Sequence, residues 1–144
     1  AEPEPVEETT TTVVALDPVD VLLVEVADDF ERVDSVTYNE AIGVLEMEGL
    51  FPSIVFSPGI EIRDELSDIV QDASKSELEY ETLNVRVILV LVDELGNESE
   101  SLVIDAIWDA ETVRAINWTN FNQENILSVG EVSFLHPSLR EDLG

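Results

Sequence analysis

The chain has 144 residues, of which 44% are hydrophobic, so it can bury a core and does not have the composition of a disordered segment. It carries 33 Asp and Glu against 6 Lys and Arg, a formal net charge of -27. This balance leaves no basic patch to neutralise phosphates and argues against a nucleic-acid partner. Cysteine is absent, which excludes disulfides, thiolate metal sites and a cysteine nucleophile.

The excess of acid has two explanations. Lys75 is the single lysine, and self-repulsion among so many carboxylates destabilises a compact state at low salt. Molar salt shortens the Debye length to about 3 Å and screens that repulsion. We therefore expect a salt-adapted, halophilic protein. The alternative is an acidic face that serves a cationic partner or binds calcium.

Residues 1–12, AEPEPVEETTTT, combine Pro, Glu and Thr without apolar periodicity. This composition predicts an extended, self-repelling linker, followed by a single domain over residues 13–144. An alanine start also fits cleavage after a small-residue signal. We therefore expect an extracytoplasmic protein, periplasmic or at the cell surface, with a membrane tether upstream.

The first half of the domain is expected to hold two helices, one strand and a short apolar piece. Residues 19–26, VDVLLVEV, follow Pro18 and predict a strand. Thr37 and Glu40 match a capping box, which predicts a helix ending near Gly49. The apolar piece at 53–57 predicts a strand or an ordered loop. Residues 60–73 have apolar positions at helical spacing and predict the second helix.

The second half is expected to be sheet. Glu and apolar residues alternate over 77–81, which predicts an edge strand with an acidic face. A shift of phase at Thr82 predicts a bulge or break before the next strand. Further strands are predicted at 102–108, 112–121 and 129–135.

Residues 87–92 are apolar at every position, which predicts a strand covered on both faces. Residues 93–101, DELGNESES, are predicted to be an exposed connector too long for a tight hairpin turn. The expected fold class is α+β, with two helices packed on one face of a twisted, mainly antiparallel sheet of about four to six strands.

Asp105 stands among apolar residues in LVIDAIW. A buried carboxylate in a pocket can act as a general acid or base, and antiparallel pairing would bring Arg86 and Arg114 near it. The competing interpretation is a structural ion pair or an Asp on a solvated sheet face, since such networks also perturb carboxylates.

Trp108 and Trp118 are predicted near the ends of adjacent strands. Together with Arg114 and Arg86 they are the candidate ligand-binding residues, because aromatic side chains at a sheet rim can stack on an apolar ligand. The competing interpretation is that both tryptophans belong to the core, where each buries a large apolar area.

Asp93, Asn97, Glu98 and Glu100 gather oxygen atoms around a glycine and are weak candidates for a calcium site. They do not match the EF-hand spacing, and a solvated acidic loop is the competing interpretation, as it is for Asp28 to Glu31. No Gly-rich phosphate loop, nucleophile elbow or histidine cluster is present, so no cofactor is expected.

Three functions follow as hypotheses. The first is a non-catalytic extracytoplasmic binding or interaction domain for a protein or small ligand. The second is a small pocket enzyme that uses Asp105 as acid or base, with an arginine holding an anionic substrate. The third is an acidic mimic of nucleic acid or sink for a cationic partner, motivated by the net charge alone.

Overall fold

The computed structural model describes residues 17–52 and 58–140. The described chain has three α-helices, five strands and two short 3-10 turns, which confirms the α+β class. In chain order they are α2 (Pro18–Val26), β1 (Arg32–Asn39), β2 (Val44–Leu50), α3 (Pro58–Lys75), β3 (Thr82–Val92), β4 (Glu98–Asp109), α4 (Ala110–Ala115), η1 (Gln123–Asn125), β5 (Glu131–Leu135) and η2 (Pro137–Leu139).

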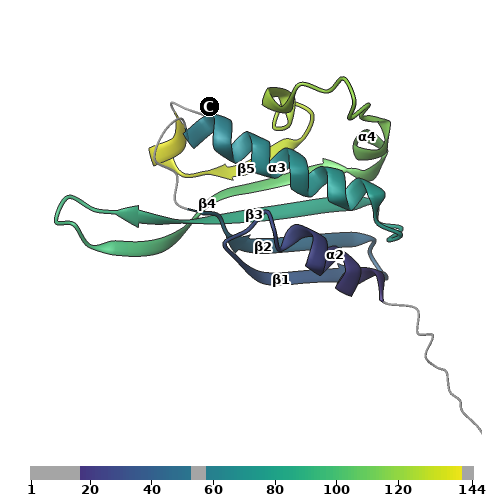
Figure 1. Cartoon of the computed structure of the whole chain (residues 1–144), viewed down its shortest axis with the longest axis horizontal. Helices are drawn as coiled ribbons and strands as arrows, with labels where there is room; N and C mark the ends of the chain where they lie inside the picture. The colour runs from purple at the N-terminus through teal and green to yellow at the C-terminus, as the bar shows by residue number, and fades with distance from the viewer. Residues whose placement is uncertain (1–16, 53–57, 141–144) are drawn as a thin grey trace, which may run out of the picture.

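The strands form one five-stranded sheet in the order β1-β2-β3-β4-β5. Strands β2 and β3 are parallel and joined through α3, whereas the other neighbouring pairs are antiparallel. Helices α2 and α3 lie side by side over one face of the sheet (Figure 1). The core fills the space between these layers, and Leu45, Met47, Leu66 and Val85 are completely buried in it.

The β3–β4 hairpin projects from one end of the sheet (Figure 1). Beyond Ile88, which pairs with Leu50, strand β3 has only β4 as a neighbour. The two strands stay paired to Val92 and Glu98. We call this projecting part of the hairpin, residues 89–101, the arm. No third strand pairs with it.

The strand predicted at 19–26 is wrong, because these residues form helix α2. Asp17 caps the helix by accepting the backbone N–H of Val19 at 2.8 Å, and Pro18 occupies the first turn, where its missing N–H costs nothing. Leu22 and Val26, four residues apart, are buried against the sheet and α3. The dense Val and Leu content concealed this helical spacing.

The helix predicted from Thr37 to Gly49 is also wrong, because this segment is the β1–β2 hairpin. Asn39 accepts the N–H of Ala41 at 3.1 Å, and Gly43 takes a positive φ of 68°, so the chain turns where the capping box predicted a helix start. Leu45 and Met47 alternate with Glu46 and Glu48, and the paired strands bury the apolar members.

Two predicted strands in the second half are absent from the described chain. Residues 77–81 form an irregular segment that buries Leu78 and Tyr80, and the regular strand begins at Thr82 where the phase shift predicted a break. Residues 112–121 hold the end of α4 and a loop rather than a strand.

The two central strands of the second half are present, but their surroundings differ from those expected. Strand β3 is covered on one face only, and Val90 is 40% exposed. Strand β4 starts at Glu98, so the connector is the shorter segment 93–97. The second helix and the strands predicted at 102–108 and 129–135 are confirmed as α3, β4 and β5.

The piece predicted at 53–57 and the linker predicted at 1–12 lie outside the described residues. Within the described ranges, no helix combines the length and the apolar character needed to cross a bilayer.

Candidate functional site

Alternate residues of the strands point away from the helices and form the surface that we call the open face. On β3 the buried residues Val85 and Val87 alternate with Arg86 and Ile88, which point to the open side. The strand register aligns their neighbours in rows across the sheet. The open face includes Arg32, Thr37, Glu46, Glu48, Leu50, Asn84, Arg86, Ile88, Val90, Leu102, Asp105 and Phe134.

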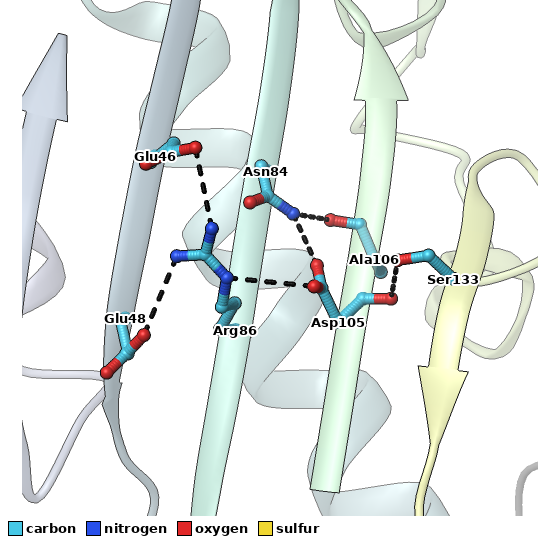
Figure 2. A network of polar contacts seen from close by, with 7 residues as sticks. All are labelled: Glu46, Glu48, Asn84, Arg86, Asp105, Ala106 and Ser133. Atoms are coloured by element: carbon cyan, nitrogen blue, oxygen red, sulfur yellow. Dashed lines mark hydrogen bonds and ion pairs between the residues drawn. The ribbon is translucent and has the colours of Figure 1, made fainter. Parts of the chain in front are cut away.

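Arg86 lies at the centre of this face between three carboxylates (Figure 2). Its guanidinium nitrogens are 3.5 Å from Glu46 Oε2, 3.5 Å from Glu48 Oε1 and 3.6 Å from Asp105 Oδ2. One positive charge therefore faces three negative charges at distances longer than a close bidentate pair. The centre of the open face keeps an excess of negative charge.

Asp105 is held by two neighbours on β3. The side-chain amide of Asn84 donates to Asp105 Oδ1 at 2.6 Å and to the backbone oxygen of Ala106 at 3.0 Å (Figure 2). Arg86 faces the other carboxylate oxygen. The Asp105 side chain keeps 26% of its surface exposed, so it is only partly buried. These contacts form an ion-pair network across β3 and β4, and the acid or base role of Asp105 stays a prediction.

Apolar side chains continue the open face toward the hairpin arm. Leu50, Ile88 and Leu102 are adjacent in one row across β2, β3 and β4. Leu102 is 37% exposed and Phe134, whose row partner is Asp105, is 40% exposed. Leu50 is buried at 9% exposure and Ile88 is half-buried, so the exposed apolar surface beside the carboxylates is that of Leu102 and Phe134.

Arg32 on β1 is the cross-strand partner of Leu50 and so belongs to the row that contains Ile88 and Leu102. It donates from Nη1 and Nη2 to the two carboxylate oxygens of Glu100, both at 2.8 Å, and from Nε to Asp34 at 2.7 Å. Hydrogen bonds from Arg32 lower the pKa of the Glu100 carboxyl. This contact ties the edge strand β1 to the base of the β3–β4 arm.

The two tryptophans predicted as ligand-binding residues lie on the helical side of the sheet. Trp108 is buried, and its indole N–H donates to the backbone oxygen of Ile126 at 2.8 Å. Trp118 is half-buried and packs edge-on against Phe121, with ring centroids 5.4 Å apart. Trp108 is thus part of the core. Neither indole lies on the open face with Arg86.

Arg114 lies apart from Asp105. Its guanidinium stands 4.7 Å from the centre of the Tyr80 ring and donates to the backbone oxygens of Leu78 at 3.1 Å and Tyr80 at 3.4 Å. It therefore fastens the irregular segment before β3 to α4. Of the two arginines predicted near Asp105, the fold brings only Arg86 there.

The acidic connector uses its first carboxylate to form a turn. Asp93 Oδ1 accepts the backbone N–H groups of Leu95 at 2.8 Å and Asn97 at 2.9 Å, and these bonds lower the pKa of Asp93. Glu98 and Glu100 belong to β4, where Glu100 binds Arg32. Over residues 17–52 and 58–140, no three His, Asp or Glu side chains come together as a metal would require.

A second acidic cluster lies where the turn after α2 meets helix α3, and it contains Asp29 and Asp72. Burial, followed by the charge of Asp72, raises the pKa of Asp29 to about 8. Burial also raises the pKa values of Asp72, Asp68 and Glu65. The sequence predicts Asp29 in a solvated loop, whereas the fold places its carboxyl next to that of Asp72.

Sequence reasoning missed Glu46 and Glu48 because it assigned them to a helix. The available signal was the strict alternation of VLEMEGL, which is typical of a strand with one buried face. Asn84 gave no signal by itself, since its role depends on the cross-strand position of Asp105.

No family model, curated protein or solved structure matches this chain in the comparisons.

Proposed function

We propose that the chain is a non-catalytic binding domain and that the open face is its working surface. The observation that supports this proposal is the exposed apolar surface of Leu102 and Phe134, next to the half-buried Ile88 and beside the carboxylates around Arg86. Contiguous exposed apolar surface rimmed by polar groups is typical of interaction sites. The contacts of Asp105 with Asn84 and Arg86 account for that carboxylate without a catalytic role.

Site-specific photo-cross-linking tests this proposal. A photoreactive phenylalanine derivative would replace Leu102 on the open face or, as the control, Val24, an apolar residue of α2 that is 71% exposed. After irradiation in native extract, we expect a discrete adduct from the Leu102 position and none from the Val24 position. Equal labelling from both positions, or no adduct from Leu102, would contradict a binding role for the open face.

We further propose that the acidity adapts this domain to high salt. None of the described Asp or Glu residues is fully buried. Their negative charges therefore lie at or near the surface, where they repel one another. The expected result is a melting temperature that rises from low salt to molar NaCl, because screening relieves the repulsion. A melting temperature that is unchanged by NaCl, and raised only by millimolar CaCl2, would instead favour calcium binding.

An extracytoplasmic location also belongs to the proposal, and its support is the Pro, Glu and Thr composition of residues 1–12. Fractionation of cells that express the natural gene tests it. Recovery of the protein in the cytosolic fraction would contradict it.

A further inference from the structure

We propose that the open face binds an extended polypeptide segment whose sheet-facing side chains, at every second position, are Arg or Lys followed by an apolar residue. The inference rests on the proposed binding function and deepens it by naming the chemistry of the partner. In the bound state, the cationic side chains would lie over Glu46 and Glu48, and the apolar ones over Leu102 and Phe134.

Charge complementarity supports a cationic occupant. Glu46, Glu48 and Asp105 share the single guanidinium of Arg86. The side chains of Glu46 and Glu48 are 41% and 34% exposed, so both carboxylates keep surface for a second cation. A guanidinium offers five N–H donors in a planar fork that matches such carboxylates.

The geometry of the sheet supports an extended segment. Glu46 and Glu48 lie two residues apart on β2, at the spacing that alternate side chains of a β-strand share. The next row along the strands holds Leu50, Ile88 and Leu102. An extended segment laid along β2 therefore places every second side chain over Glu46, Glu48 and the apolar row in turn.

Other occupants fit the face less well. A second copy of the chain would bring the same excess of carboxylates against Glu46 and Glu48, and like charges placed together oppose association. Residues 1–12 of the chain hold four Glu and no Lys or Arg, so they carry the wrong charge. Nucleic acid and anionic membranes are repelled for the same reason.

Peptide binding measured by fluorescence anisotropy, at about 0.15 M salt where the Debye length is about 8 Å, tests the inference. The probe, called the Arg–Val peptide, is labelled and carries Arg, Arg and Val at successive alternate positions with Ser between them, so that all three side chains of the extended chain point to one side. Two control peptides replace Arg by Gln or Val by Ser. We expect the Arg–Val peptide to bind more tightly than either control, because each control lacks one of the two complementary features.

Matched variants locate the binding site. The double change Glu46→Gln and Glu48→Gln removes two charges from the open face, whereas Glu77→Gln with Glu111→Gln removes two exposed charges elsewhere. We expect roughly a tenfold loss of Arg–Val affinity for the first pair, equivalent to ~1.4 kcal/mol, and little loss for the second. Leu102→Ser should weaken binding, while Val24→Ser should not.

The outcomes separate this inference from the binding function on which it rests. Equal losses from both pairs of Gln variants would show non-specific attraction to an acidic surface and overturn the inference. A specific cross-link from Leu102 without binding of the Arg–Val peptide would retain the binding function and reject this partner class. A dimer seen by sedimentation and abolished by Leu102→Ser would assign the face to a second copy instead.

Discussion

The two faces of the sheet are made from alternate residues of the same strands, yet their physical roles are opposite. On β2, Met47 is completely buried beneath the helices, while its neighbours Glu46 and Glu48 point to the open side and bind Arg86. One strand therefore contributes both to the core and to a charged surface. Burial of apolar area stabilises the first face, whereas the second is free to serve recognition.

The largest expected effect separates the two faces at adjacent positions. Met47→Ala should lower the free energy of unfolding by about 2–5 kcal/mol, because it leaves a cavity in the covered face. Glu48→Ala should lower it by less than about 1 kcal/mol, because it removes one partly exposed ion-pair partner. Urea unfolding measures both values. Equal losses would mean that the open face is also packed.

A second test compares two glycines. A Cβ at Gly49 would lie 2.5 Å from Phe30 Cδ1 and 2.6 Å from the Arg32 backbone oxygen, so Gly49→Ala should cost about 2–3 kcal/mol. Gly96, at the tip of the arm, has nothing within 4 Å of its Cβ position and a φ of 84°. Gly96→Ala should therefore cost only about 1 kcal/mol of backbone strain. A larger loss at Gly96, measured by thermal unfolding, would contradict the view of the arm as free of packing.

The charge network of the open face predicts a smaller, salt-dependent effect. Arg86→Met leaves Glu46, Glu48 and Asp105 facing one another without a cation, and we expect a loss of about 1 kcal/mol that shrinks in molar NaCl. Lys75→Met removes the same charge from an exposed helix end and is the control. Thermal melts of both variants at two salt concentrations measure the difference, and identical salt responses would argue against the network.

The smallest expected effect concerns pH on the helical side. The pKa of Asp29 rises from 3.8 to about 8 on folding, so the folded state binds this proton more tightly than the unfolded state does. Stability should therefore fall as the pH rises from about 4 to 8. Asp29→Asn should remove part of this fall and raise stability near pH 8 by ~1 kcal/mol, or a few degrees in Tm.

Melting curves from pH 5 to 8 compare Asp29→Asn with Asp28→Asn, an exposed neighbour. The Asp28 variant should follow the pH dependence of the natural protein. If the Asp29 variant follows it as well, the carboxyl pair with Asp72 does not control this part of the pH response.

Sequence periodicity identified the elements in which apolar residues recur at the spacing that burial of one face requires. The apolar stripe of α3 and the β-rich runs of β3 and β4 were predicted correctly, because burial of one stripe or face imposes periods of 3.6 and 2. Antiparallel pairing across the connector also predicted the proximity of Arg86 to Asp105, although the same reasoning placed Arg114 there as well. These statements depend only on neighbours along one hairpin.

Other features depended on partners distant in sequence. Residues 19–26 pack as a helix because α3 and β1 cover Leu22 and Val26, although Val-rich segments also suit strands. The Thr37 capping box was overridden by pairing between β1 and β2 and by the turn at Gly43. Arg114 was drawn to Tyr80 rather than to Asp105.

By itself, the sequence determined the α+β class, the acidic composition, the long helix α3 and the β3–β4 hairpin, since composition and local period carry that information. Only the tertiary structure decided which face of the sheet stays open. The parallel crossing from β2 through α3 to β3 sets Glu46 and Glu48 beside Arg86. That register depends on packing of the whole helical layer, because a shift of one residue would turn these carboxylates into the core.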